Sequence, residues 1–201
     1  MFMNHDQAEL LVTQVQHAHR LLAGFYQRIL PAIDNLAGHY NATFWYWEPS
    51  EFSRPCGASI RPSSKWAWDF LPLVATRLVY VKDEGGGMRT NDLVMEFHLR
   101  CDPAVLREQR DLRQAKGQPD PTSLPPISPS LKVYLYRPLP GLDTELKQAW
   151  EEAEHPSGAP RVFHPLTGNL EGAWLEIPLA EFLCSPQGLS NEISRLVGPI
   201  V

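Results

Sequence analysis

Prolines interrupt this chain too often for a bundle of long helices. The 201 residues include 19 prolines, about twice ordinary usage. Because proline disrupts the interiors of helices and sheets, we expect short elements joined by ordered loops. The proportions of hydrophobic and charged residues, 43% and 20%, are ordinary for globular proteins, so the chain should fold around a core.

One long helical pattern stands out, near the N-terminus. Apolar residues recur there at alternating spacings of four and three, at Leu11, Val15, Ala18, Leu22, Phe25 and Ile29. The stripe predicts an amphipathic helix that packs on a sheet, capped by Asn4 or Asp6, interrupted or kinked at Pro31 and ended at Gly38. A helical partner would also suit the spacing, but the stripe is short for a coiled coil and contains Gly24.

Extended and helical segments alternate after this helix. Strands are predicted at 42–48, 73–82, 92–101, 131–137 and 173–179, and further helices at 103–116, at 185–197 and from Asp143 or Thr144 to Glu154. The glycines at 85–87 should join two strands as a hairpin, and residues 117–130 form a proline-rich surface loop. We therefore expect one α+β domain over residues 1–201, with helices packed on a mainly antiparallel sheet of about five strands.

Charge and cysteine content narrow the classes of partner and compartment. The net charge is −5, which makes nucleic acid an unlikely partner because phosphate backbones are bound by basic surfaces. No apolar run is long enough to cross a membrane, and no secretion pattern is seen near residue 1, so we expect neither membrane association nor export. Three widely spaced cysteines, Cys56, Cys101 and Cys184, favour a reduced, cytoplasmic protein.

The segment 92–101 places chemically active side chains on one face. Glu96, His98 and Arg100 alternate with apolar residues, so a strand directs all three to the same side. Such a trio can hold a carboxylate or phosphate group or position a general base, and Asp69, Arg77 or His164 are candidates to join it across the sheet. The alternative is a solvent-facing strand with cross-strand charge pairs. No metal-binding, nucleophile or phosphate-binding motif is present, so we expect no metal and no other cofactor.

Four of the six tryptophans lie between Phe44 and Phe70. Strand alternation puts Trp45 and Trp47 on one face, which favours a place in the core. The other two follow a polar loop that contains several cations, and indoles beside cations are typical of binding surfaces. The candidate binding residues are Arg54, Arg61, Lys65, Trp66 and Trp68.

These patterns favour a binding protein over an enzyme. The leading hypothesis is a cytoplasmic, bacterial accessory protein that binds another protein or itself, as an adaptor or a self-associating module. Its candidate contacts are residues 54–70 and the loop 117–130. The alternative is a hydrolase-like or nuclease-like enzyme, or a small-ligand-binding protein, with a polar pocket built on Glu96, His98 and Arg100.

Overall fold

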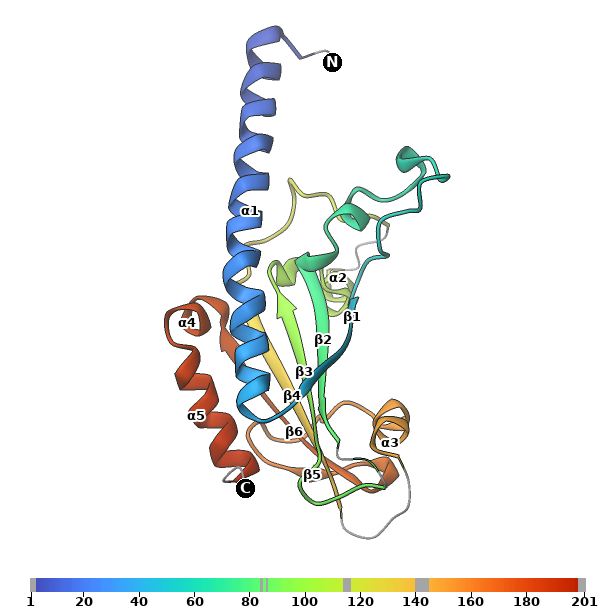
Figure 1. The fold of residues 1–201 in the computed structure, drawn as a ribbon. Helices are drawn as coiled ribbons and strands as arrows, with labels where there is room; N and C mark the ends of the chain where they lie inside the picture. The colour runs from blue at the N-terminus through green and yellow to red at the C-terminus, as the bar shows by residue number, and fades with distance from the viewer. Residues whose placement is uncertain (1–2, 84, 86, 114–116, 140–144, 199–201) are drawn as a thin grey trace.

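A six-stranded antiparallel sheet forms the centre of the protein, and helices cover both of its faces (Figure 1). The computed structural model describes residues 3–83, 85, 87–113, 117–139 and 145–198. The strands are ordered β1-β2-β3-β4-β6-β5. This arrangement confirms the expected α+β fold and adds one strand to the expected five.

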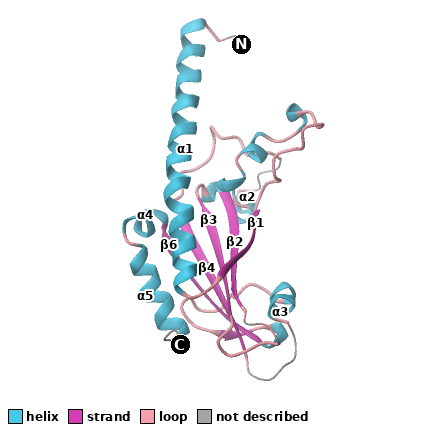
Figure 2. Cartoon of the chain, in the orientation of Figure 1, coloured by secondary structure: helices cyan, strands magenta, loops and turns pink. Residues whose placement is uncertain are grey.

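The bounds of the elements agree with most of the predicted segments (Figure 2). The strands are β1 (Thr43–Pro49), β2 (Ala75–Lys82), β3 (Leu93–Arg100), β4 (Ser130–Pro138), β5 (His164–Pro165) and β6 (Leu170–Pro178). The described α-helices are α1 (His5–His39), α2 (Arg107–Leu112), α3 (Leu146–Glu152), α4 (Leu179–Cys184) and α5 (Pro186–Val197). Sequence patterns missed β5 and α4, because elements of two and six residues are too short to show a period.

Two predicted helices differ from the structure. The helix expected at 103–116 is a 3₁₀ turn (Pro103–Val105) followed by the short α2, and residues 114–116 lie outside the described part of the chain. Asp143 and Thr144, the predicted starts of the next helix, also lie outside it, and α3 follows Glu145. Within the described residues, no helix is both long and apolar enough to cross a bilayer.

Helix α1 agrees closely with the predicted bounds and passes through Pro31. A capping box begins it, in which Asn4 Oδ1 accepts a hydrogen bond from Gln7 N (2.9 Å) and Gln7 Oε1 accepts one from Asn4 N (3.1 Å). The helix is not interrupted at Pro31, and it ends at His39, one residue beyond the predicted stop at Gly38. Packing of the neighbouring turns against the sheet offsets the backbone hydrogen bond that proline cannot make.

Only the C-terminal half of α1 packs on the sheet. Ile29, Ile33 and Leu36 are buried, whereas every residue from His5 to Leu21 is exposed. Figure 1 shows this N-terminal half rising beyond the sheet. We call residues 5–21 the projecting segment; for them, the expectation of packing on the sheet is wrong.

Apolar side chains fill both faces of the sheet. On one face, side chains of β2, β3, β4 and β6 pack against α1, α4 and α5 through residues such as Phe97, Leu131 and Phe182. On the other face, Val94 and Tyr136 pack against Trp150 of α3. The sheet therefore lies between two helical layers, and a polar side chain on either face is enclosed unless the covering layer leaves a gap.

A β-bulge in β1 corrects the prediction for the first tryptophan pair. The register of β1 against β2 shifts between Phe44 and Tyr46, so Trp45 is the extra residue. Trp45 consequently packs with the α3 side of the sheet and Trp47 with the α1 side. Both are partly buried, but they lie on opposite faces rather than together, because the bulge breaks the two-residue alternation.

Candidate functional site

A carboxylate is buried at the centre of the sheet. Glu96 lies on β3, between Val79 of β2 and Tyr134 of β4, and its side chain is 0% exposed. A buried charge is stable only if other groups replace the water that it has lost. Four side chains do so, as His98 Nε2 (2.7 Å), His155 Nε2 (3.2 Å) and Arg77 Nη1 (3.4 Å) contact Oε1 and the Tyr136 hydroxyl donates to Oε2 (3.3 Å).

These partners come from four parts of the chain. His98 shares the strand and the face of Glu96, and Arg77 lies directly opposite His98 in the β2–β3 register. Tyr136 belongs to β4, and His155 lies in the segment that follows α3. The ring of Tyr134, also on β4, contacts both imidazoles edge-on, with centroids 5.0 and 4.8 Å away.

A cavity of about 340 Å³ opens beside Glu96. Its lining residues are Tyr46, Arg77, Glu96, Tyr136, Trp150, Glu151, Ala153 and His155. The Arg77 guanidinium lies 5.6 and 5.8 Å from the ring centres of Tyr46 and Trp150, and Nη2 pairs with Glu48 at 2.5 Å. Its buried Nε has no hydrogen-bond partner among the described residues. The cavity thus combines aromatic walls with charged groups. We call it the Glu96 pocket.

The partners of Glu96 determine its charge. Burial alone would raise the pKa of Glu96, but hydrogen bonds from His155 and His98 outweigh it and hold the pKa well below its usual range. The carboxylate is therefore ionised at neutral pH. Burial lowers the pKa of His98, against the opposing effect of Glu96, so this imidazole is neutral at the same pH.

Comparison with known proteins gives a family for the chain. A family model described as PM0109 matches residues 5–167, which include α1 and all the side chains around Glu96. The chain belongs to the PM0109 family. No curated protein and no solved structure matches this chain. The match to the family model ends at residue 167, so it does not include β6, α4 or α5.

In this PM0109 member, the structure brings together two of the three residues predicted on β3. Glu96 and His98 meet, but Arg100 turns to Glu176 (3.4 Å) and Glu108 (3.6 Å). The side chains of Glu96, His98 and Arg100 are 0%, 14% and 16% exposed, so a solvent-facing strand is wrong. Trp150 of α3 and His155 lie over Glu96, and His155 also contacts His98. Arg77 joins Glu96 as one of the candidates across the sheet.

The other two candidates lie elsewhere, and one member of the site was missed. Asp69 accepts a hydrogen bond from Ser53 N, and His164 lies against Gly158. Sequence reasoning did not identify His155, which follows a helix by three residues and belongs to no periodic pattern. A histidine directly before a proline was the only local signal that the sequence offered.

The two tryptophans proposed for binding have different environments. Trp66 is 41% exposed, whereas Trp68 is buried in a stack on Phe52, with ring centroids 5.6 Å apart. Trp68 Nε1 also donates a hydrogen bond to the Pro119 carbonyl at 2.8 Å. Trp68 therefore anchors the proline-rich loop 117–130, and Trp66 alone presents its ring to solvent.

The three cations near these tryptophans also have different environments. The Arg54 guanidinium lies 5.0 Å from the Trp47 ring centre and donates to the Trp47 carbonyl at 2.8 Å. Arg61 and Lys65 are exposed, and Lys65 lines a polar surface hollow with Trp66. Residues 53–71, which we call the arm, extend away from the sheet (Figure 1) and carry these side chains.

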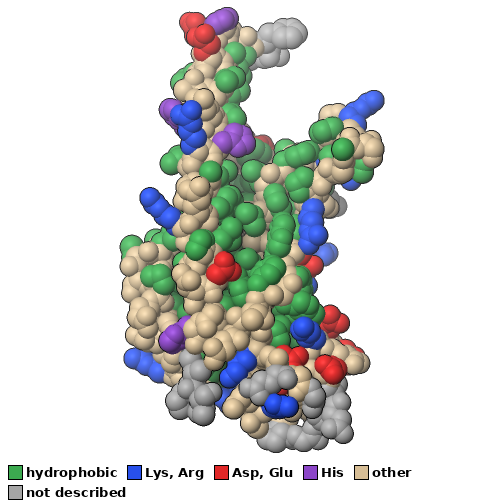
Figure 3. Space-filling view, viewed as in Figure 1, with side chains coloured by type: hydrophobic (Ala, Val, Ile, Leu, Met, Phe, Trp, Pro, Cys, Tyr) green, Lys and Arg blue, Asp and Glu red, His purple; other side chains and the backbone are tan. Residues whose placement is uncertain are grey.

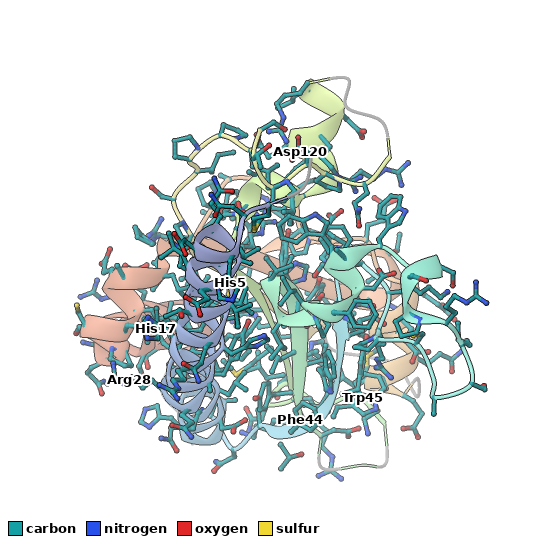
Figure 4. All side chains as sticks on the ribbon, turned by 90° about the horizontal axis from the view of Figure 1, so that it is seen from above. His5, His17, Arg28, Phe44, Trp45 and Asp120 are labelled. Atoms are coloured by element: carbon teal, nitrogen blue, oxygen red, sulfur yellow. The ribbon has the colours of Figure 1, made fainter. Side chains whose placement is uncertain are left out.

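A second candidate site is an apolar surface on α1. Figure 3 shows hydrophobic side chains along the projecting segment and on the surface between α1 and the arm. Leu11 and Val15 are 46% and 47% exposed. Toward the sheet, the surface continues into an apolar cavity of about 540 Å³ lined by Leu30, Phe44, Trp47 and residues of β2 and the preceding turn.

Proposed function

We propose that this protein is a cytoplasmic, bacterial assembly module that pairs with a second copy of itself through the projecting segment of α1. The observation that supports this proposal is the apolar stripe of α1, which is buried at one end of the helix and exposed at the other. The three free cysteines are consistent with a reducing compartment.

The exposed and buried parts of the stripe point in the same direction. Leu11 and Ile29 are 18 residues apart, as are Val15 and Ile33, and 18 residues make five turns of an α-helix. The face that the sheet covers near Ile29 therefore continues without rotation to Leu11. A helix gains most of its stability from packing of its apolar face, so this surface favours a partner.

The charges on the projecting segment favour a second copy as that partner. Asp6, Glu9 and Arg20 all lie about 150–170° around the helix from the stripe. In the projecting segment, the stripe and its flanks therefore carry no Asp, Glu, Lys or Arg side chain. Two copies that meet along this face leave their charged side chains in water and bring no like charges together.

Steric constraints favour antiparallel helices in the pair. Beyond residue 24, the sheet of the same copy covers the stripe, so a parallel pair would force two sheets into the space between the helices. An antiparallel pair places the two sheets at opposite ends and remains symmetric. The expected contact spans roughly 25 Å, the length of 17 helical residues.

Light scattering combined with size-exclusion chromatography tests the proposal. The wild type should show a mass near twice the 22.7 kDa of one chain across the micromolar range. Leu11→Glu with Val15→Glu puts two charges into the contact and should give a monomer with unchanged far-ultraviolet circular dichroism. Thr13→Glu with Gln16→Glu adds the same charges about 170° and about 130° from the stripe and should remain dimeric. A monomeric wild type would overturn the proposal.

The Glu96 pocket supports a second candidate function, the binding or conversion of a small ligand. The observation that favours it is the buried carboxylate with two imidazoles beside an open cavity. This function is independent of pairing through α1, because the pocket lies on the α3 side of the sheet and α1 covers the other side.

A further inference from the structure

We propose that Glu96, His98 and His155 form a binding site for a divalent first-row transition-metal ion such as Zn²⁺. Their candidate ligand atoms, one carboxylate oxygen and two imidazole nitrogens, all lie within 4.8 Å of one another. The site goes beyond the proposed pairing through α1 and does not depend on it.

The spacing of the donor atoms matches a coordination sphere. Ligand atoms about 2.0–2.2 Å from a metal ion lie about 3.0–3.5 Å apart in tetrahedral or octahedral geometry. Glu96 Oε1 lies 2.7 Å from His98 Nε2 and 3.2 Å from His155 Nε2. Both distances are within a few tenths of an ångström of that spacing, and the two imidazole nitrogens lie within 4.8 Å of each other.

The fold positions the three side chains before any ion arrives. β3 fixes Glu96 and His98 on one face, and burial restricts both side chains. The Tyr134 ring contacts both imidazoles, whose planes cross at 84°. Such support from surrounding side chains orients the first ligands of metal sites and raises their affinity.

The ligand set indicates the kind of ion and site. Two imidazoles and one carboxylate suit Zn²⁺ and its neighbours better than Mg²⁺ or Ca²⁺, which prefer oxygen ligands. Three protein ligands beside a cavity are typical of sites that keep a position for water or a small ligand. Glu96 and His155 both line the cavity of about 340 Å³.

Among the residues that the structure describes, Arg77 is the one Lys or Arg that contacts Glu96, and a carboxylate offsets its charge. Its guanidinium lies 3.4 Å from Glu96 Oε1, but Glu48 pairs with it at 2.5 Å. The Glu48 carboxylate reduces the repulsion between Arg77 and a bound cation. A neutral imidazole binds an ion through Nε2 when its proton is on Nδ1, so both histidines can ligate in that tautomer.

Metal titration of the full chain tests the site. After chelator treatment and dialysis, the protein should bind one equivalent of Zn²⁺ by calorimetry and should melt at a higher temperature with the ion. Co²⁺ should produce visible absorption bands typical of nitrogen and oxygen ligands. His155→Gln should weaken Zn²⁺ binding by at least about a hundredfold, more than the loss of an outer partner causes.

A second set of possible metal ligands, on the surface of α1, makes a matched control necessary. His5, Asp6 and Glu9 at the start of α1 also lie close enough together to hold an ion, but all three are exposed. His5→Gln should leave the tight equivalent and the Co²⁺ bands unchanged. Because His155 is 47% exposed, its variant should fold, and circular dichroism checks this. The absence of a stoichiometric equivalent, or one that survives His155→Gln and disappears in His5→Gln, would overturn the site.

Discussion

Glu96 and His98 lie two residues apart on one strand face, and Oε1 of Glu96 is 2.7 Å from Nε2 of His98. This pair stands inside the protein under α3 rather than on a solvent face. A buried carboxylate that depends on nearby hydrogen-bond donors links folding stability to pH.

Replacing Glu96 with glutamine should lower stability most at neutral pH. The folded-state pKa of Glu96 is depressed well below its ordinary value of about 4.5, so its contribution to stability is present above that value and is lost as pH falls below it. Glu96→Gln should cost about 3 kcal/mol at pH 7, because it disrupts a buried charge network with Arg77. In urea unfolding, the difference in unfolding free energy between wild type and Glu96→Gln should shrink as pH falls below 4.5. A difference that stays constant with pH would contradict this.

Trp66 and Trp68 should respond differently to truncation. Trp68→Ala removes a buried ring and the hydrogen bond to Pro119, and should lower the free energy of unfolding by about 3–5 kcal/mol. Trp66→Ala removes an exposed ring and should cost under about 1 kcal/mol. Urea denaturation measures both, and faster proteolysis within the loop 117–130 should accompany only Trp68→Ala. Equal costs would refute the separate roles.

A methyl group at Gly172 should disturb the segment that carries His155. A Cβ there would lie 2.6 Å from Leu166 Cδ1 and closer still to Pro156 Cγ, next to His155 in the chain. Gly172→Ala should therefore lower stability by about 1–3 kcal/mol. Gly24→Ala is the control, because nothing lies within 4 Å of its Cβ position and α1 should gain about 1 kcal/mol. Thermal and urea unfolding of both variants decide the matter.

Replacing Pro31 with alanine should stabilise α1. The helix passes through this exposed proline, so alanine restores one backbone donor and removes a ring from the helix interior. We expect the free energy of unfolding to rise by about 1–3 kcal/mol. Asn35→Ala, at another exposed position of the same helix, should change it by much less. A lower unfolding midpoint for Pro31→Ala would show that the proline favours the helix geometry.

Local patterns predicted the elements of this fold well where they were long and regular. The alternation in β3 put Leu93, Met95, Phe97 and Leu99 on one face and Glu96 on the other, and the structure packs the apolar face on the side of α1. Asn4 was one of two proposed caps, and it forms the cap of α1. These features depend on residues within one or two turns or strand positions, so the sequence alone contains the information.

Patterns failed where distant segments or an irregular backbone decided the outcome. The bulge at Trp45 separated two tryptophans that alternation had placed together. Burial of Trp68 depends on Phe52 and Pro119, which approach it from other parts of the chain. Neither the bulge nor these approaches has a period that a window of sequence reveals.

Local sequence patterns were enough to establish the α+β class, the long stripe of α1 and the face on which Glu96 and His98 lie. Tertiary packing established that the sheet ends before the stripe does, and that His155 contacts Glu96. The physical reason is that side-chain direction follows from local backbone geometry, whereas the neighbours of a side chain depend on the path of every loop between them.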